Sequence, residues 1–221
     1  MISSARNEPS AKAESILEAA KRSFLAHGFG AVSMEAIARE AQVSKATVYA
    51  HFSSKEELFG AVIGRECERR FAGFSAQELD PREAYASLAI LGRRFLELIL
   101  SPDAIALHRI ILGEVTRFPV LGEVFWNAGP ERNLRQIAAF MAEAAAAGTL
   151  AIGDPRVAAE QFSGLVRGEV QLRQLLGLER EPGAAAIPAA VESAVAMFLR
   201  AYRPQSKLPS SASRRCPLAK W

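Results

Sequence analysis

Residues 33–52 read SMEAIAREAQVSKATVYAHF and carry the clearest structural signal in the chain. Ser33 is a favourable helix N-cap. Apolar residues then recur at the spacing of one helix face: Met34, Ile37, Ala38 and Ala41. Gln42 and Val43 predict a tight turn, and Ser44 can cap a second short helix. Two short helices joined in this way are typical of the helix-turn-helix unit, whose second helix lies in the DNA major groove.

The second of these helices carries side chains that suit DNA. Lysine can donate to guanine, threonine can contact a thymine methyl or a phosphate, and tyrosine can bond a phosphate. We expect four positions on the exposed side: Lys45, Thr47, Tyr49 and His51. The alternatives are a helix pair that only packs, a His51 that only packs at the helix end, and a Ser44 that only caps.

The flanking segments support the same interpretation. Residues 53–58 read SSKEEL and contain two overlapping capping boxes, Ser53 with Glu56 and Ser54 with Glu57. They predict a new helix with Lys55 in its first turn, where a phosphate would be favoured. Before the pair, residues 10–27 predict a helix that ends at Gly28.

These residues resemble the DNA-binding domain of the TetR/AcrR family of bacterial regulators over roughly residues 10–70. The resemblance rests on Ala20, Phe24, Gly28, Ser33, Ile37, Ala38, Val43, Tyr49, His51, Phe52 and residues 55–58. It implies DNA contacts by Ser33, Ser44, Lys45, Ala46, Thr47, Tyr49, His51 and Lys55. Tyr49 and Lys55 would hold phosphates, and Lys45 and Ala46 would select sequence. Ala46 departs from the Gly or Pro that many members carry.

Composition bounds the rest of the chain. Half of the 221 residues are hydrophobic, and alternating strand patterns are almost absent, which predicts an all-α protein. No apolar run is long enough for a membrane span, the N-terminus does not read as a secretory signal, and the two cysteines match no disulfide framework. We therefore expect a cytoplasmic protein, associated with the nucleoid when bound to DNA. The net charge of +3 comes largely from residues 203–221, so it is weak evidence for DNA binding.

We divide the chain into a disordered N-terminus (1–9), a DNA-binding domain (10–70), a helical effector-binding and dimerisation domain (71–202) and a basic, disordered tail (203–221). Within the third part, caps and prolines predict helices over about 80–100, 101–117, 118–147 and 154–176, and a last helix that ends near Tyr202. Gly129 and Pro130 predict a break within the third of these.

The last two helices carry apolar stripes that could form a four-helix interface between two chains. The predicted interface residues are Phe162, Leu165, Val166, Val191, Val195, Phe198 and Leu199. TetR-like proteins dimerise in this way, and a dimer would read a palindrome. The alternative is that these stripes only fill the core of one chain.

The middle helices predict an apolar cavity with a few polar groups, as small-molecule sites are built. The candidate ligand residues are Phe95, Leu98, His108, Ile111, Phe125, Trp126, Phe140 and Gln161. Most large apolar residues here must serve as core. Residues 108–168 also resemble the ligand domain of the AefR-like TetR subgroup, which implies no particular ligand.

Together these features predict a transcriptional regulator: a homodimeric repressor released from a palindromic double-stranded operator by an unknown small apolar effector. An activator on the same fold, or a ligand-binding module that has lost DNA binding, are the alternatives. Scattered histidines, unpaired cysteines and the lack of a Gly-rich phosphate loop argue against an enzyme, a metal or a cofactor. No membrane partner is expected.

Overall fold

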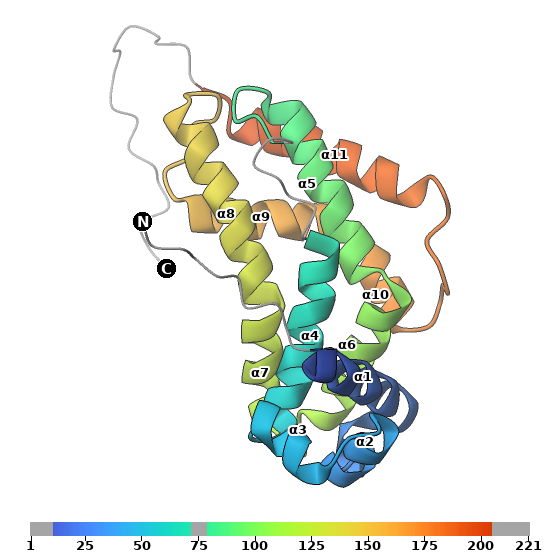
Figure 1. The fold of residues 1–221 in the computed structure, drawn as a ribbon. Coiled ribbons are helices and arrows are strands. Elements are labelled where there is room, and N and C mark those ends of the chain that lie inside the picture. The colour runs from blue at the N-terminus through green and yellow to red at the C-terminus, as the bar shows by residue number, and fades with distance from the viewer. Residues whose placement is uncertain (1–10, 72–78, 205–221) are drawn as a thin grey trace, which may run out of the picture.

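The computed structural model describes residues 11–71 and 79–204, and every regular element in these ranges is a helix (Figure 1). The helices are α1 (Ala11–Ala31), α2 (Met34–Glu40), α3 (Lys45–His51), α4 (Lys55–Phe71), α5 (Ala84–Ile99), α6 (Pro102–Glu114), α7 (Val120–Ala128), α8 (Pro130–Ala146), α9 (Pro155–Arg167), α10 (Val170–Leu175) and α11 (Ala186–Ala201). The predicted all-α fold is confirmed. The predicted N-terminus (1–9) lies outside the described residues, as does the predicted tail apart from Arg203 and Pro204.

The helix-turn-helix forms at one end of the molecule, with α1 packed across it (Figure 1). The Ser33 side chain accepts a hydrogen bond from the Ala36 N–H at 3.1 Å, so the predicted cap of α2 is in place. Gln42 takes a positive φ of 56° in the turn before α3. Gly28 also has a positive φ, 77°, and interrupts α1 where the sequence predicts the helix to stop.

Helix α4 joins this end to the rest of the chain, and its first half lies in a shared hydrophobic core. Leu58 and Phe59 are fully buried. The Phe59 ring packs edge-on against Phe24 and Phe29, with centroids 5.0 and 5.4 Å apart. The same cluster takes in residues of α6 and α7, including Ile111. The core therefore continues across the two regions that the sequence predicts to be separate domains.

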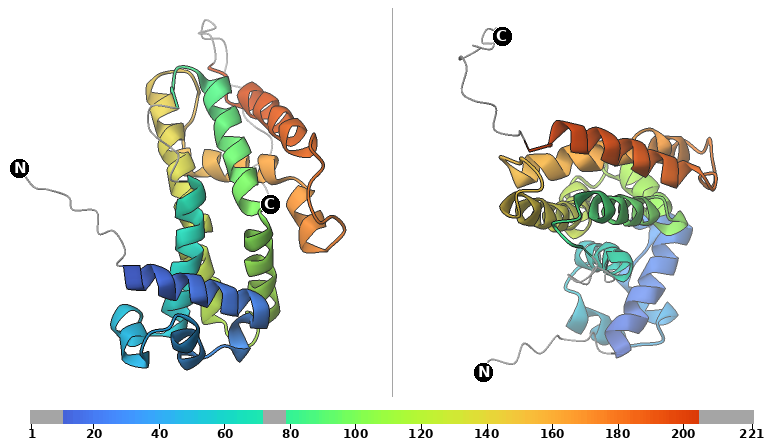
Figure 2. Two further views of the ribbon diagram at one scale, coloured as in Figure 1. Left: turned by 45° about the vertical axis from the view of Figure 1, so that its right-hand side comes forward. Right: turned by 90° about the horizontal axis from the view of Figure 1, so that it is seen from above.

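A second core holds α5, α8, α9 and α11 together (Figure 2). Phe162 of α9 packs edge-on against Phe198 of α11 at 5.3 Å. Gly92 of α5 packs against α9 and α11. A Cβ added at Gly92 would come within 3.3 Å of Val191 and 3.4 Å of Phe162. The three helices approach closely because this position has no side chain.

Two helix boundaries differ from the prediction. Helix α5 begins at Ala84 because Asp80 instead closes a turn, accepting from the Arg82 N–H at 2.8 Å. Helix α9 ends at Arg167, where Gly168 has a φ of 46°, and α10 follows in a new direction. The predicted break at Gly129 is confirmed, because α7 ends at Ala128 and α8 begins at Pro130. Among the described residues, no helix combines the length and apolarity needed to cross a membrane.

The predicted dimer stripe is largely internal. Five of its residues are buried within the single chain: Phe162, Val166, Val191, Val195 and Phe198. They fill the space between α5, α9 and α11, so the prediction that they face a partner is wrong. Of the seven predicted residues, Leu165 is 37% exposed and Leu199 is partly exposed, so these two keep surface for a second chain.

Replacing Phe162 with alanine should test its place in the core. We expect Phe162→Ala to lower the free energy of unfolding by about 3–5 kcal/mol, because it removes a buried ring and leaves a cavity. Leu178, which is 65% exposed, provides the control, and Leu178→Ala should change stability by less than about 0.5 kcal/mol. Urea denaturation of both variants measures the difference. Equal stabilities would contradict the packing described here.

Candidate nucleic-acid interface and ligand cavity

Helix α3 presents one buried and one exposed side. Val48 is fully buried and anchors the helix to α1 and α2. Ser44 caps it, accepting from the Thr47 N–H at 3.0 Å, and the two hydroxyls lie 2.8 Å apart. The remaining predicted DNA residues lie toward solvent: Ser33, Lys45, Ala46, Tyr49 and His51 are exposed, and Thr47 is partly exposed. The structure therefore brings these seven positions to one end of the molecule.

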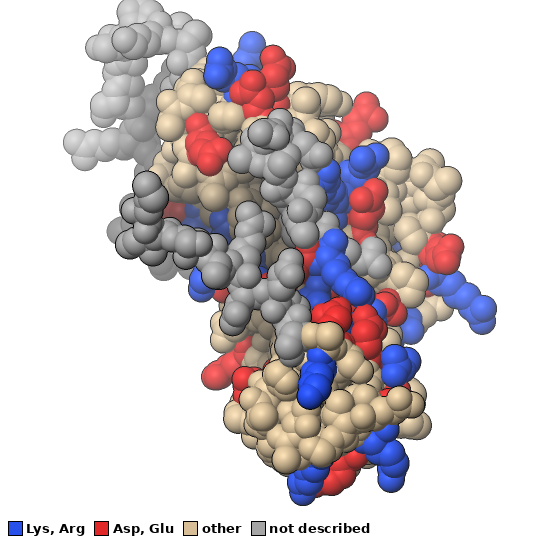
Figure 3. Space-filling model, in the orientation of Figure 1, with Lys and Arg blue, Asp and Glu red and all other residues tan. Residues whose placement is uncertain are grey.

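This end of the molecule carries both signs of charge. Figure 3 shows basic and acidic side chains side by side where α2 and α3 lie, on an otherwise uncharged surface. One such pair is Lys45 with Glu35, and the carboxylate raises the pKa of the lysine through a hydrogen bond and its charge. Both side chains are more than half exposed. An exposed ion pair of this kind is worth little, so a phosphate or a base can displace Glu35 at small cost.

Lys55 does not behave as predicted. Its ammonium donates to the carbonyl oxygens of Phe29 and Val32 at 2.9 and 2.8 Å, and lies 4.2 Å from the centroid of the Phe29 ring. Burial lowers the pKa of Lys55. Lys55 thus links the first turn of α4 to the C-terminal end of α1 through hydrogen bonds. The prediction that its ammonium faces outward toward a phosphate is therefore wrong.

Of the two capping boxes predicted for α4, the Ser54–Glu57 box forms in part, because the Glu57 carboxylate binds Ser53 rather than Ser54. The Ser54 hydroxyl accepts from the Glu57 N–H at 3.1 Å, and the Glu57 carboxylate reaches back to the Ser53 N–H at 2.8 Å. The Ser53 hydroxyl also donates to the Glu57 carboxylate, and this bond, followed by the one from the Ser53 N–H, lowers the pKa of Glu57. Helix α4 is thus fixed at its first turn, next to α3.

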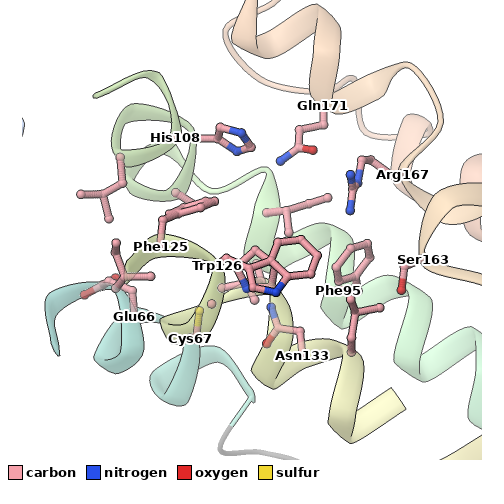
Figure 4. A pocket seen from close by; sticks show the side chains of 18 residues that line it. Glu66, Cys67, Phe95, His108, Phe125, Trp126, Asn133, Ser163, Arg167 and Gln171 are labelled. Atoms are coloured by element: carbon pink, nitrogen blue, oxygen red, sulfur yellow. The ribbon is translucent and has the colours of Figure 1, made fainter. Parts of the chain in front are cut away.

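A cavity of about 350 Å³ lies between α4, α5, α6, α7, α8, α9 and α10 (Figure 4). Five predicted ligand residues line it: Phe95, Leu98, His108, Phe125 and Trp126. Its walls are mostly apolar, and the His108 ring packs against Phe125 with centroids 5.2 Å apart. Trp126 is 46% exposed, so it lies where the cavity opens to solvent.

Three predicted ligand residues lie elsewhere. Ile111 belongs to the core shared by α4 and α6, and Phe140 to the core of α5, α8, α9 and α11. Gln161 is exposed and accepts a hydrogen bond from the Tyr202 hydroxyl at 2.6 Å. Helical spacing shows which residues share a face of a helix, but it does not show which part of that face meets a cavity.

Several polar residues that line the cavity were not predicted: Glu66, Cys67, Asn133, Ser163, Arg167 and Gln171. Figure 4 shows two groups of polar side chains. The Gln171 amide lies between the His108 ring and the Arg167 guanidinium on one side, and Glu66, Cys67 and Asn133 lie on the other. The polar residues near the end of α9 and in α10 are a sequence signal for Ser163, Arg167 and Gln171. Glu66, Cys67 and Asn133 lie on α4 and α8, outside that signal.

Two sets of contacts tie the cavity helices to α1. Lys21 of α1 pairs with Glu66 of α4 at 2.9 Å and with Asp103 of α6 at 2.6 Å. At the far end of α6, the Glu114 carboxylate accepts from the Gly30 N–H at 3.0 Å. A displacement of α4 or α6 at the cavity must therefore strain contacts with the helix that supports the DNA-reading unit.

The Cys67 thiol gives a test of the cavity wall. Burial raises its pKa to about 11, with the nearby carboxylates of Glu66 and Glu68 adding to the rise. Since the thiolate is the reactive form, iodoacetamide should alkylate Cys67 at pH 8 about 100-fold more slowly in the folded protein than in urea. A Cys216→Ser background leaves Cys67 as the only cysteine. Equal rates in the two conditions would show that Cys67 does not lie in this environment.

Comparison with known proteins agrees with this architecture. Residues 16–62 match the family described as bacterial regulatory proteins, tetR family. Residues 86–204 match the AefR-like transcriptional repressor, C-terminal domain. The transcriptional regulator UidR of Escherichia coli K12 is 44% identical over 59 residues. That match covers 27% of this chain and 30% of UidR, so this chain spans less than a third of the length of that curated relative.

Solved structures extend the likeness over most of the chain. The Flavonoid-responsive Regulator FrrA is 40% identical, with a TM-score of 0.71, over 88% of this chain and 98% of FrrA. A TetR-family regulator from Mesorhizobium loti MAFF303099 is 28% identical, with a TM-score of 0.69, over 87% of this chain and 96% of that one. With the helix-turn-helix at one end and the helical cavity above it, this chain belongs to the TetR family of transcriptional regulators and carries an AefR-like C-terminal domain.

Proposed function

We propose that this protein is a homodimeric repressor that binds a palindromic DNA operator and releases it when a small, largely apolar molecule enters the cavity. The outward face of α3 carries this proposal, because it presents Lys45, Thr47, Tyr49 and His51 around a buried Val48. Such a helix can enter a major groove without disturbing its own packing. A protein with this role acts in the bacterial cytoplasm, on the nucleoid.

The proposed DNA contacts divide by chemistry. Lys45 and Ala46 stand at the start of α3, where base edges are read, and Tyr49 can donate to a phosphate. Ser33, Ser44, Thr47 and His51 are placed to add further contacts along α2 and α3. The proposed face leaves out Lys55, because its ammonium is held by carbonyls of the chain itself.

A dimer supports the reading of a palindrome, since two recognition helices must be held at a fixed spacing. The outward sides of α9 and α11 offer a surface for it. Val157 and Leu165 on α9 are 42% and 37% exposed, and Met197 on α11 is 50% exposed. We propose that these side chains meet their copies in a four-helix interface, which leaves Leu199 on the opposite flank of α11. We keep the boundary at residue 70 as a functional one between the DNA-binding region and the effector-binding region, because the two regions share a hydrophobic core.

The effector would shift the population between two dimer conformations that hold the recognition helices at different spacings. It can do so only by the difference between its affinities for the two conformations. The cavity supports a ligand role because helices α4 and α6 both line it and both contact α1. The likeness to FrrA, which is named as flavonoid-responsive, supports an aromatic effector.

Replacing Tyr49 tests the DNA face directly. We expect Tyr49→Ala to weaken operator binding at least about 10-fold, equivalent to about 1.4 kcal/mol, because it removes a phosphate hydrogen bond and a ring. The measurement is a gel shift on DNA from upstream of the gene, at fixed salt and with non-specific competitor. Tyr85→Ala is the matched control, since Tyr85 is 55% exposed on a different part of the chain. Unchanged binding by Tyr49→Ala would exclude this face.

Charged substitutions test the dimer surface. The double variant Leu165→Glu, Met197→Glu should elute at the mass of one 23.9 kDa chain, because two like charges would be buried against their copies. Light scattering after size exclusion gives the mass. Leu112→Glu is the control, since Leu112 is 58% exposed on α6, and it should remain dimeric. A double variant that stays dimeric would place the interface elsewhere.

A further inference from the structure

The polar end of the cavity carries one charge that nothing in the described chain balances. Glu66 and Arg167 are the lining residues that are charged at neutral pH, and the Glu66 carboxylate is 2.9 Å from the Lys21 ammonium. Arg167 is exposed and has no carboxylate partner among the described residues, and its guanidinium carbon lies 6.0 Å from the centroid of the Phe95 ring. The cavity therefore has a net positive end.

Gln171 is a second, independent feature of this end that suits a ligand. It is only 7% exposed, lines the cavity, and makes no hydrogen bond to another described residue. Figure 4 shows its amide directed into the cavity between His108 and Arg167. The amide is not sealed from the cavity, so a bound molecule that supplies an acceptor can reach it and give it a hydrogen-bond partner that the described residues do not.

His108 completes this end as a neutral group. Burial lowers the pKa of its ring, and the positive charge of Arg167 lowers it further. A neutral imidazole offers one donor and one acceptor, and it adds no charge. Arg167, Gln171 and His108 together therefore present several donors and one positive charge, which matches a ligand group with a single negative charge on oxygen.

The position of this polar end is fixed by a separate arginine. Arg109, next to His108 on α6, donates to the carbonyl of Gln174 at 2.5 Å and to that of Leu175 at 3.1 Å. These bonds hold the C-terminal end of α10 against α6. Gln171 on α10 is thus held opposite His108, so the donors do not need to be assembled by the ligand.

From these observations we propose that the effector is an aromatic monoanion, whose rings lie against Phe95, Phe125 and Trp126 and whose ionised oxygen is bound by Arg167 and Gln171. This deepens the proposed function, because it names the ligand class for the same cavity. A cavity of about 350 Å³ has room for a molecule of two or three rings. Burial lowers the pKa of Arg167, but the residue as a whole is exposed, so its attraction for an anion is partly screened by water.

The test compares two probes of the same shape, biphenyl-4-carboxylate and biphenyl-4-carboxamide. Trp126 and Trp221 are the two tryptophans of the chain, so a Trp221→Phe background lets fluorescence report from the cavity alone. Binding is measured on the full chain without DNA. We expect the carboxylate to bind at least about 10-fold more tightly than the amide. Arg167→Gln should abolish that preference by weakening the carboxylate, and Arg167→Lys should restore part of it.

Arg180→Gln is the matched control, because it removes one positive charge from an exposed loop residue outside the cavity, and it should keep the full preference. Thermal unfolding confirms that each variant is folded. The proposal is overturned if the two probes bind equally well, if neither saturates the Trp126 signal, or if Arg167→Gln keeps the preference. Operator binding is measured separately, so a protein that selects the carboxylate but binds no DNA would sink the proposed function and leave this one standing.

Discussion

The packing of Leu58 and Phe59 against Phe24 and Phe29 is the constraint on which the rest of the molecule depends. These four residues fix the first half of α4 within the DNA-reading end. Because α4 is one continuous helix, the same packing sets where its second half, with Glu66 and Cys67, meets the cavity. A sharp kink within two turns would cost helix hydrogen bonds, so α4 forms a stiff connection between the cavity and the DNA-reading end.

The ion pairs at the junction determine how that connection can respond. Lys21 is shared between Glu66 on α4 and Asp103 on α6, and its side chain is mostly shielded from solvent. A shielded pair loses more than an exposed one when its partners separate, because each charge is left poorly solvated. The Glu114 contact with Gly30 adds a second point at which α6 holds α1.

Local signals explain why the DNA-reading end could be predicted from sequence. Ser33, Ser44 and Ser54 each cap a helix within three residues of themselves, and the apolar spacing of α2 sets its buried side. The errors lie where distant residues decide. The position of Lys55 at a helix start predicts a contact with DNA. Its ammonium instead donates to the backbone carbonyls of Phe29 and Val32, more than twenty residues away in the sequence. Phe95 and Phe140 both belong to the same buried core, and only the tertiary packing brings Phe95 to the cavity wall as well.

The break between α9 and α10 shows how one local feature can create a site. A straight helix from residue 154 to 176 would carry Gln171 along the axis of α9. The positive φ of Gly168 ends α9 directly after Arg167, and α10 then turns toward α6 (Figure 2). Only in that direction can the carbonyl end of α10 reach Arg109. The glycine therefore has a structural consequence beyond ending a helix, because it brings the Gln171 amide and the Arg167 guanidinium to the same end of an apolar cavity.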